Sequence, residues 1–170
     1  MTETAKYVPT LELWARLFQA PTVDRYLADN AEACKPPAFS DYIGRLCQSR
    51  DEKPEWVINR SGIERSYGHR LFSGTRNPSR DTVLQLAFGF DLTTDETQQL
   101  LKVARATPLH PKVKRDAIIA FCLHNHLSIM EAQQTLFENG QPIMGGKKMA
   151  QQMERHSGES ELAKQGPARE

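Results

Sequence analysis

The stretch "GIERSYGHRLFSGTRNPS", residues Gly62–Ser79, decides how the whole chain is interpreted. It opens with a glycine turn and closes with a second glycine, a polar loop and a Pro-Ser pair. Its apolar residues recur every four positions, at Ile63, Tyr67 and Leu71. That spacing is helical, and Pro followed by Ser is typical of a helix start. The stretch therefore predicts a tight turn, a short helix from about Glu64 to Ser73, a loop, and a further helix capped by Ser79.

The segments around this stretch also have helical spacing. The sequence has no run of alternating apolar and polar residues bounded by hairpin turns, so we expect an all-α fold. One helix carries an apolar stripe at helical spacing, formed by Phe39, Tyr42, Ile43, Leu46 and Cys47. The next begins near Pro54, since proline is tolerated in a first turn. Thr93 and Glu96 form a capping box for the last of five such helices.

Two prolines, Pro36 and Pro37, mark the clearest boundary in the chain, because neither can continue a helix. Length and composition fit one domain with appendages: 170 residues, 39% of them hydrophobic. We therefore expect an N-terminal helical extension over 1–37, a five-helix domain over 38–106, a C-terminal helical pair packed on its core over 107–144, and a flexible tail over 145–170.

The N-terminal extension is expected to hold two helices. The first runs from about Pro9 to Ala20 with Thr10 as its cap, and the second from about Thr22 to Ala33. The first helix carries an apolar face formed by Leu13, Trp14, Leu17 and Phe18. We expect this face to pack on the C-terminal helices; the alternative is a surface for a second copy or a protein partner.

The C-terminal pair contains the most apolar segment of the chain, "AIIAFCL", Ala117–Leu123. Because this segment is apolar all round, we expect Ile118, Ile119 and Phe121 to be largely buried. Ser128 and Glu131 form a capping box for the helix that follows. From Gly145 onward the sequence has few large apolar residues and mixed charge, which is typical of a flexible tail.

Composition excludes several classes of protein. The net charge is only +1, so any nucleic-acid-binding surface must be local. No apolar run approaches the roughly 20 residues that span a bilayer, and the first residues do not resemble a secretory signal. Three cysteines at scattered spacings favour a reduced, cytoplasmic setting over a disulfide framework.

Catalytic and metal sites are not expected. The sequence has no phosphate-binding loop, nucleophile elbow or dinucleotide fingerprint, so we predict that the protein is not an enzyme and needs no cofactor. Cys122, His124 and His126 lie close together, but no second ligand pair occurs at zinc spacing. A buried cysteine and two histidines at a helix end explain them better than a metal site does.

The five helices and the quoted stretch resemble the lambda-repressor-like helix-turn-helix family, the XRE class of bacterial and phage regulators. The resemblance covers about Phe39 to Ala106 and needs no gap in the quoted stretch. It implies a cytoplasmic, bacterial or phage-encoded protein that binds double-stranded DNA, with the helix from about Glu64 to Ser73 in the major groove. Homodimers are expected, because symmetric half-sites multiply specificity.

The resemblance assigns two sets of contacts to this chain. Base edges would be read by Glu64, Arg65, Ser66, His69 and Arg70. Phosphates would be held by Lys53, Thr75, Arg76 and Asn77. Between Arg60 and Arg80 the chain has five arginines against one acid, Glu64, a local net charge of +4. This local charge is the basic surface that the whole-chain charge hides.

Three residues depart from the family pattern. Pro54, after Lys53, stands where the family usually has a glutamine that contacts DNA. Gly68 replaces a core aliphatic residue, so we expect a bulky neighbour, Trp56 or Tyr42, against its backbone. Phe72 stands where the family often has a charged residue, and an exposed phenylalanine there suits contact with protein.

Two functions from different classes therefore remain open. The first is a sequence-specific DNA-binding transcriptional regulator. The second is a protein-interaction adaptor or inhibitor that keeps the same fold and binds its partner through Phe72 or the N-terminal helices. Salt-dependent binding to one particular duplex would favour the regulator, because phosphate contacts release counterions.

Overall fold

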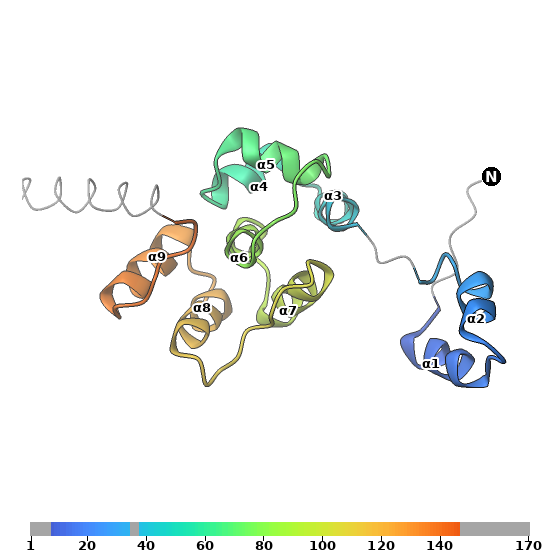
Figure 1. Cartoon of the computed structure of the whole chain (residues 1–170). Coiled ribbons are helices and arrows are strands. Elements are labelled where there is room, and N and C mark those ends of the chain that lie inside the picture. Colours follow the sequence, from blue (N-terminus) through green and yellow to red (C-terminus); the bar gives the residue numbers. More distant parts are fainter. Residues whose placement is uncertain (1–7, 35–37, 147–170) are drawn as a thin grey trace, which may run out of the picture. The chain divides into compact units, whose positions relative to one another are not determined.

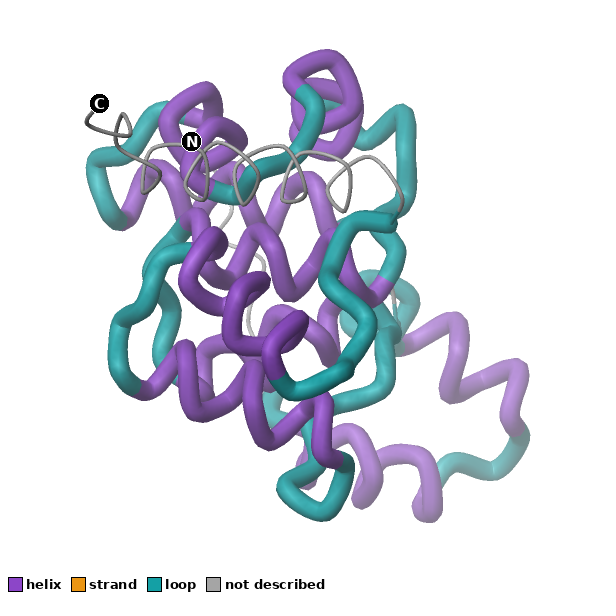
Figure 2. Tube along the Cα trace, turned by 90° about the vertical axis from the view of Figure 1, so that its left-hand side faces the viewer, coloured by secondary structure: helices purple, strands orange, loops and turns teal. Residues whose placement is uncertain are grey.

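The structure, a computed structural model, describes residues 8–34 and 38–146. In these ranges the chain forms helices joined by loops and no strand, which confirms the all-α prediction (Figure 2). The chain divides into two compact units, Met1–Pro37 and Ala38–Glu170. The expected flexible tail falls almost wholly on residues 147–170, outside the described residues.

The first unit contains α1 (Thr10–Gln19) and α2 (Val23–Asp29). Pro9, not Thr10, is the N-cap of α1, and α2 ends earlier than the sequence predicts. Trp14 and Phe18 stack on each other with ring centroids 5.6 Å apart. Their side chains are 52% and 79% exposed, and no residue of α1 is buried. The packing of this face on the C-terminal helices stays a prediction.

The second unit contains seven helices among its described residues. In chain order they are α3 (Phe39–Ser49), α4 (Pro54–Arg60), α5 (Arg65–Phe72), α6 (Arg80–Gly89), α7 (Thr94–Val103), α8 (Lys114–His124) and α9 (Ile129–Glu138). The hydroxyls of Ser79, Thr93 and Ser128 cap α6, α7 and α9, and the last two helices have complete capping boxes, as predicted.

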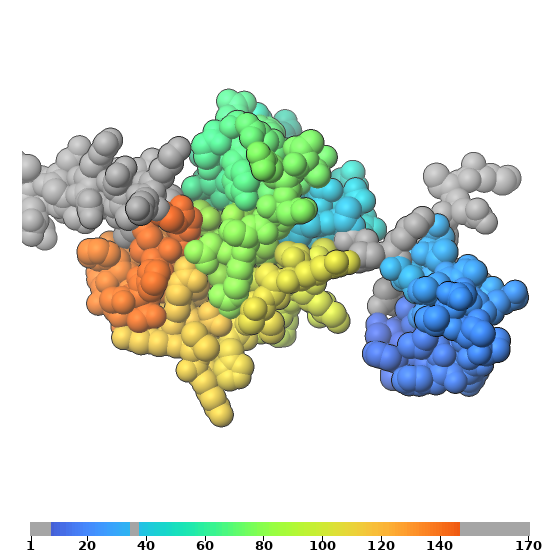
Figure 3. All heavy atoms as spheres, viewed as in Figure 1, coloured from blue at the N-terminus to red at the C-terminus, as the bar shows by residue number. Residues whose placement is uncertain are grey.

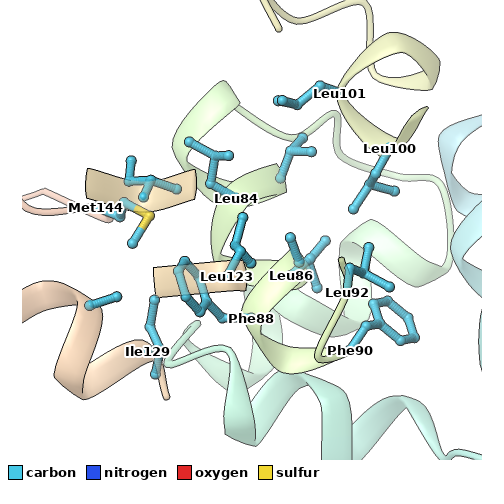
Figure 4. Close-up of a cluster of buried hydrophobic side chains, with 14 of the residues drawn as sticks. Leu84, Leu86, Phe88, Phe90, Leu92, Leu100, Leu101, Leu123, Ile129 and Met144 are labelled. Atoms are coloured by element: carbon cyan, nitrogen blue, oxygen red, sulfur yellow. The ribbon is translucent and has the colours of Figure 1, made fainter. Parts of the chain in front are cut away.

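One hydrophobic core runs through this unit, and α6 lies at its centre (Figure 1). Every residue of α6 from Thr82 to Gly89 is buried, because α4, α7 and α9 all pack on it. Leu84, Leu86 and Phe88 point into the cluster drawn in Figure 4, where Leu123 and Ile129 join them from the C-terminal helices. The C-terminal pair therefore completes the core that α6 begins.

The most apolar segment is buried on one side only. Ile119, Cys122 and Leu123 are within the core, and Ile118 is half-buried. Phe121 is 62% exposed, so its expected burial is wrong. A segment that is apolar all round does not reveal which of its faces meets the core.

The turn that joins α6 to α7 has the same conformation as the turn that joins α8 to α9. Asp91 and His126 follow the C-caps of α6 and α8 with φ of 52° and 54°. The next residue is leucine in both turns, and its amide donates to the carbonyl five residues earlier, at 2.9 Å and 3.0 Å. This is the bonding of a Schellman motif.

The match between the hairpins continues at a shift of 35 residues, the separation of Asp91 and His126. Gln98 bonds the main chain of Leu109, with its Nε2 donating to the carbonyl and its Oε1 accepting from the amide. Gln133 makes the same two bonds with Met144. The two hairpins are therefore two copies of one structural unit, a repeat that the sequence analysis does not detect.

Candidate nucleic-acid interface

The helices α4 and α5 are joined by the tight turn predicted from the quoted stretch. Ser61 caps the C-terminus of α4, and Gly62 follows with φ of 66°, a conformation that glycine adopts without strain. Ser61 is buried and its hydroxyl donates to the Val57 carbonyl at 2.6 Å. In Figure 3 this helix pair forms the green edge of the second unit.

Glu64 is the N-cap of α5. Its carboxylate accepts hydrogen bonds from the amides of Ser66 and Tyr67 and from the Ser66 hydroxyl. The Ser66 hydroxyl, followed by these two amides, lowers the pKa of Glu64 to about 2. Glu64 is therefore an anion at neutral pH whose acceptor sites are already used at the helix end.

Gly68 lies on the buried side of α5, as expected, but its neighbour is neither Trp56 nor Tyr42. A Cβ at Gly68 would lie 2.6–2.9 Å from three side-chain carbons of Ile58. Ile58 is 2% exposed, and Trp56 is 52% exposed. The glycine therefore lets α4 and α5 approach closely through a buried isoleucine.

The opposite side of α5 is open. Arg65, Ser66, His69 and Arg70 are all exposed, whereas Gly68 and Leu71 are buried. The Arg65 guanidinium donates from Nη2 to Glu55 Oε1 at 2.7 Å, and His69 Nε2 lies 3.8 Å from the same oxygen. The side chain of Arg65 is nonetheless 79% exposed, so most of its donors face water.

The loop after α5 presents the residues expected to hold phosphates. Thr75, Arg76 and Asn77 are all exposed. The amides of Thr75 and Arg76 both donate to the Arg70 carbonyl, at 3.0 Å and 3.2 Å, and the Thr75 hydroxyl lies 3.0 Å from that of Ser73. These bonds tie the loop to the last turn of α5, so the two sets of candidate residues occupy adjacent positions.

The basic surface is smaller than the count of arginines predicts. Arg60 pairs with Glu52 and bonds the Gly89 carbonyl, and Arg80 pairs with Asp116. These two arginines hold the fold together. The side chain of Arg60 is still 49% exposed, and Arg65, Arg70 and Arg76 are exposed on α5 and the following loop, where Arg65 also pairs with Glu55. Lys53 is also exposed, with its ammonium 5.3 Å from the centroid of the Trp56 ring.

Phe72 does not form the exposed protein contact expected from the sequence. Its ring is half-buried and packs against the hydrophobic core. The α1 face that carries Trp14 and Phe18 has the larger exposed apolar area, because no residue of α1 is buried. Phe72 is therefore less exposed than the apolar side chains of α1.

Glu55 is the residue of this surface that the sequence analysis misses. An acid in the first turn of a helix is expected on electrostatic grounds alone, so Glu55 carries no distinguishing pattern. Its partner Arg65 is ten residues away on the next helix, a separation that no single-helix spacing rule detects.

One of the two histidines near the end of α8 has a structural partner. His126 Nδ1 lies 2.8 Å from Asp91 Oδ1, and Cys122 is buried, which raises the pKa of its thiol. Within the described ranges, no group of three or more His, Cys, Asp or Glu residues is arranged to hold a metal ion. None of the described helices is long and apolar enough to cross a membrane.

Comparison of the chain with protein-family models, curated proteins and solved structures finds no match.

Proposed function

We propose that this protein is a sequence-specific regulator that binds double-stranded DNA by placing α5 in the major groove. The observation that carries the proposal is the division of α5 into a buried side, Gly68 and Leu71, and an exposed side with Arg65, Ser66, His69 and Arg70. A B-DNA major groove, about 12 Å wide, admits one α-helix. A helix fixed by its inner side and polar on its outer side meets that requirement.

The proposed roles of the exposed side chains follow from their chemistry. Arg65 begins α5 and suits a bidentate contact with the O6 and N7 atoms of a guanine. Ser66, His69 and Arg70 follow within the next turns and reach neighbouring bases or sugars. Glu64 is better suited to positioning than to base reading, because its carboxylate already accepts several hydrogen bonds at the helix end.

Phosphate contacts are assigned to Lys53 at the start of α4 and to Thr75, Arg76 and Asn77 after α5. Hydrogen bonds hold the loop of the last three against Arg70, which supports a fixed register on the DNA backbone. Arrangement of α3–α7 as in the lambda-repressor-like family is part of this proposal. So is binding as a homodimer, since one such module reads only a few base pairs.

A protein-interaction adaptor is the second candidate function. It is favoured by the apolar side chains that α1 exposes, Leu11, Trp14 and Phe18. Exposed apolar patches of this kind often mark protein-binding surfaces. The half-burial of Phe72 removes the other surface that the sequence suggested for this role.

The two functions are separated by selection of duplexes from a random DNA pool at near-physiological salt. The regulator reading predicts a recurring motif and a binding constant for it that falls steeply as salt rises, with a slope near −0.9 for each phosphate contact. Equal affinity for every duplex, or none, would leave the adaptor as the better account. Recovery of a protein complex that Trp14→Ala and Phe18→Ala abolish would then support it.

A further inference from the structure

Three ionisable side chains from α4 and α5 meet at the surface assigned to DNA. Glu55 lies in the first turn of α4, Arg65 is the first residue of α5, and His69 is one turn further along. Glu55 Oε1 accepts from Arg65 Nη2 at 2.7 Å and lies 3.8 Å from His69 Nε2. One carboxylate oxygen therefore faces both side chains expected to read bases from this edge of α5.

The geometry of this cluster leaves Arg65 restrained but not blocked. A guanidinium has five N–H donors in a planar fork, and Glu55 accepts from one nitrogen. Arg65 lines, with Glu55, Ile58, Asn59 and Ile63, a hollow of about 340 Å³. The remaining donors of Arg65 are free to bind a base edge while the pair with Glu55 stays formed.

We propose that Glu55 is a specificity-determining residue, which restrains the Arg65 guanidinium so that it favours a guanine over a phosphate. This inference rests on the proposed function. Arginine has a long side chain with many rotamers, and a second anchor reduces the number that it samples. An arginine that stays paired with Glu55 reaches only the base edges near the start of α5.

Charge gives the second half of the argument. If Arg65 turned away to a phosphate, the carboxylate of Glu55 would lose its guanidinium partner beside a polyanion, with only the more distant His69 imidazole, at 3.8 Å, near it. That arrangement is unfavourable, and it becomes more so as binding excludes water from the interface. With Arg65 on a guanine, the carboxylate keeps its partner. Glu55 therefore weakens binding to the wrong sequences more than to the right one, which is how repulsive elements create specificity.

A purely local role for Glu55 makes a different prediction. An acid in the first turn stabilises its helix through the macrodipole, wherever its side chain points. In that case a neutral replacement would change thermal stability slightly and leave base preference unaltered. Measurement of base preference therefore separates the two roles, and a melting curve alone would not.

The experiment uses Glu55→Gln, which keeps the length of the side chain and removes its charge. Equilibrium binding is measured for the duplex selected by the wild-type protein and for the same duplex with the guanine of the Arg65 contact replaced. We expect Glu55→Gln to bind the replaced duplex more tightly and to lose about tenfold in discrimination, within the range that one bidentate pair contributes. Glu138→Gln is the same change on α9. It should alter the affinity for both duplexes by the same small factor, because it only removes one negative charge, and should leave the discrimination between them unchanged.

A double-mutant cycle tests whether Glu55 acts through Arg65. In an Arg65→Ala background, Glu55→Gln should produce no further change in discrimination, because Glu55 affects base preference only through the Arg65 guanidinium, which is already absent. An unchanged discrimination in Glu55→Gln alone, with a wild-type protein that does select a motif, would overturn this inference and leave the proposed function intact. A wild-type protein that selects no motif would remove the proposed function, and this inference with it.

Discussion

Arg80 and Asp116 form a 2.9 Å ion pair that joins the first residue of α6 to the first turn of α8. The neighbouring residues make the reciprocal pair, Arg115 with Asp81, also at 2.9 Å. Each hairpin thus has Arg-Asp in the first turn of its first helix, and each arginine binds the aspartate of the other copy. This exchange is the one expected when two copies of a structural unit pack about an approximate two-fold axis.

Removal of the Asp116 carboxylate should strongly destabilise the second unit. The side chain is 7% exposed and also accepts from the His110 amide, so Asp116→Ala leaves Arg80 without its charged partner in a largely buried site. We expect a loss of about 3–5 kcal/mol in the free energy of unfolding, measured by urea denaturation.

Asp91 supplies the matched control within the same pair of hairpins. Its pair with His126 is exposed, at 67% and 61% of the two side chains, and asparagine tolerates the left-handed conformation at this position. Asp91→Asn should therefore change stability by about 1 kcal/mol or less. Equal losses in the two variants would contradict the view that burial distinguishes these pairs.

A side chain at Gly68 should destabilise the contact between α4 and α5. Alanine gains about 1 kcal/mol over glycine in a free helix. Here its Cβ would lie 2.6–2.9 Å from Ile58, a stiff β-branched side chain in the core. We therefore expect Gly68→Ala to lower the free energy of unfolding by about 1–3 kcal/mol, measured by thermal denaturation. In an Ile58→Ala background the same change should become stabilising; if it stays destabilising there, Ile58 is not the obstacle.

Two residues of α8 should respond to truncation in opposite ways. Ile119 is fully buried, so Ile119→Ala should lower the free energy of unfolding by about 2–5 kcal/mol. Phe121 is 62% exposed, and Phe121→Ala should change it by only about 0.5 kcal/mol. Urea denaturation of both variants tests which side of α8 faces the core. If α8 were rotated by half a turn about its axis, Phe121 would be buried and Ile119 exposed, and the two results would be exchanged.

The elements whose signals are local are predictable from the sequence. Ser79, Thr93 and Ser128 cap their helices as expected, because a cap depends on a few adjacent residues. The exposure of Phe121 is not predictable, because a helix without a polar stripe gives no indication of which of its sides faces the core. The duplicated hairpin does leave a trace in the sequence, since Arg80, Glu96 and Gln98 recur 35 residues later as Arg115, Glu131 and Gln133, but these few matches are spread too thinly to stand out without the structure.

The candidate site, too, has features that local sequence predicts and features that only the tertiary fold creates. The turn at Gly62 and the exposure of Arg65 and Arg76 follow from the quoted stretch. The pair of Arg65 with Glu55, and the use of Arg60 and Arg80 as structural cations, depend on residues that only the tertiary fold brings together. Counting arginines along the chain therefore overestimates the basic surface.

Glu64 should titrate far below an ordinary glutamate. Its pKa is about 2 in the folded protein and near 4.5 in the unfolded chain, chiefly because the Ser66 hydroxyl donates to the carboxylate. A lowered folded pKa contributes stability that is present above pH 4.5 and is lost as pH falls toward 2. Carboxyl carbon shifts recorded by NMR from pH 7 to 2 should give this pKa, and Ser66→Ala should raise it. An unshifted titration would show that the cap does not form.

Two arginine variants should separate base recognition from phosphate binding. Arg65 begins α5, where we propose that side chains meet base edges, and Arg76 lies in the following loop, where we propose phosphate contacts. Arg65→Ala should cost about 1–3 kcal/mol on the selected duplex and remove the preference at one base position. Arg76→Ala should keep the selected motif, weaken binding to all duplexes evenly, and lower the salt slope by about 1.

Phe72→Ala completes this comparison as a variant outside both sets of contacts. Because the ring packs on the core, its loss should reduce stability while leaving the selected motif unchanged. Base preference and melting temperature must therefore be measured on the same preparations. If both arginine variants bind DNA as the wild-type protein does, while a Trp14→Ala variant loses a protein complex isolated from cells, the interaction function replaces the regulator. The exposed side of α5 would then owe its basic residues to solubility and not to a groove.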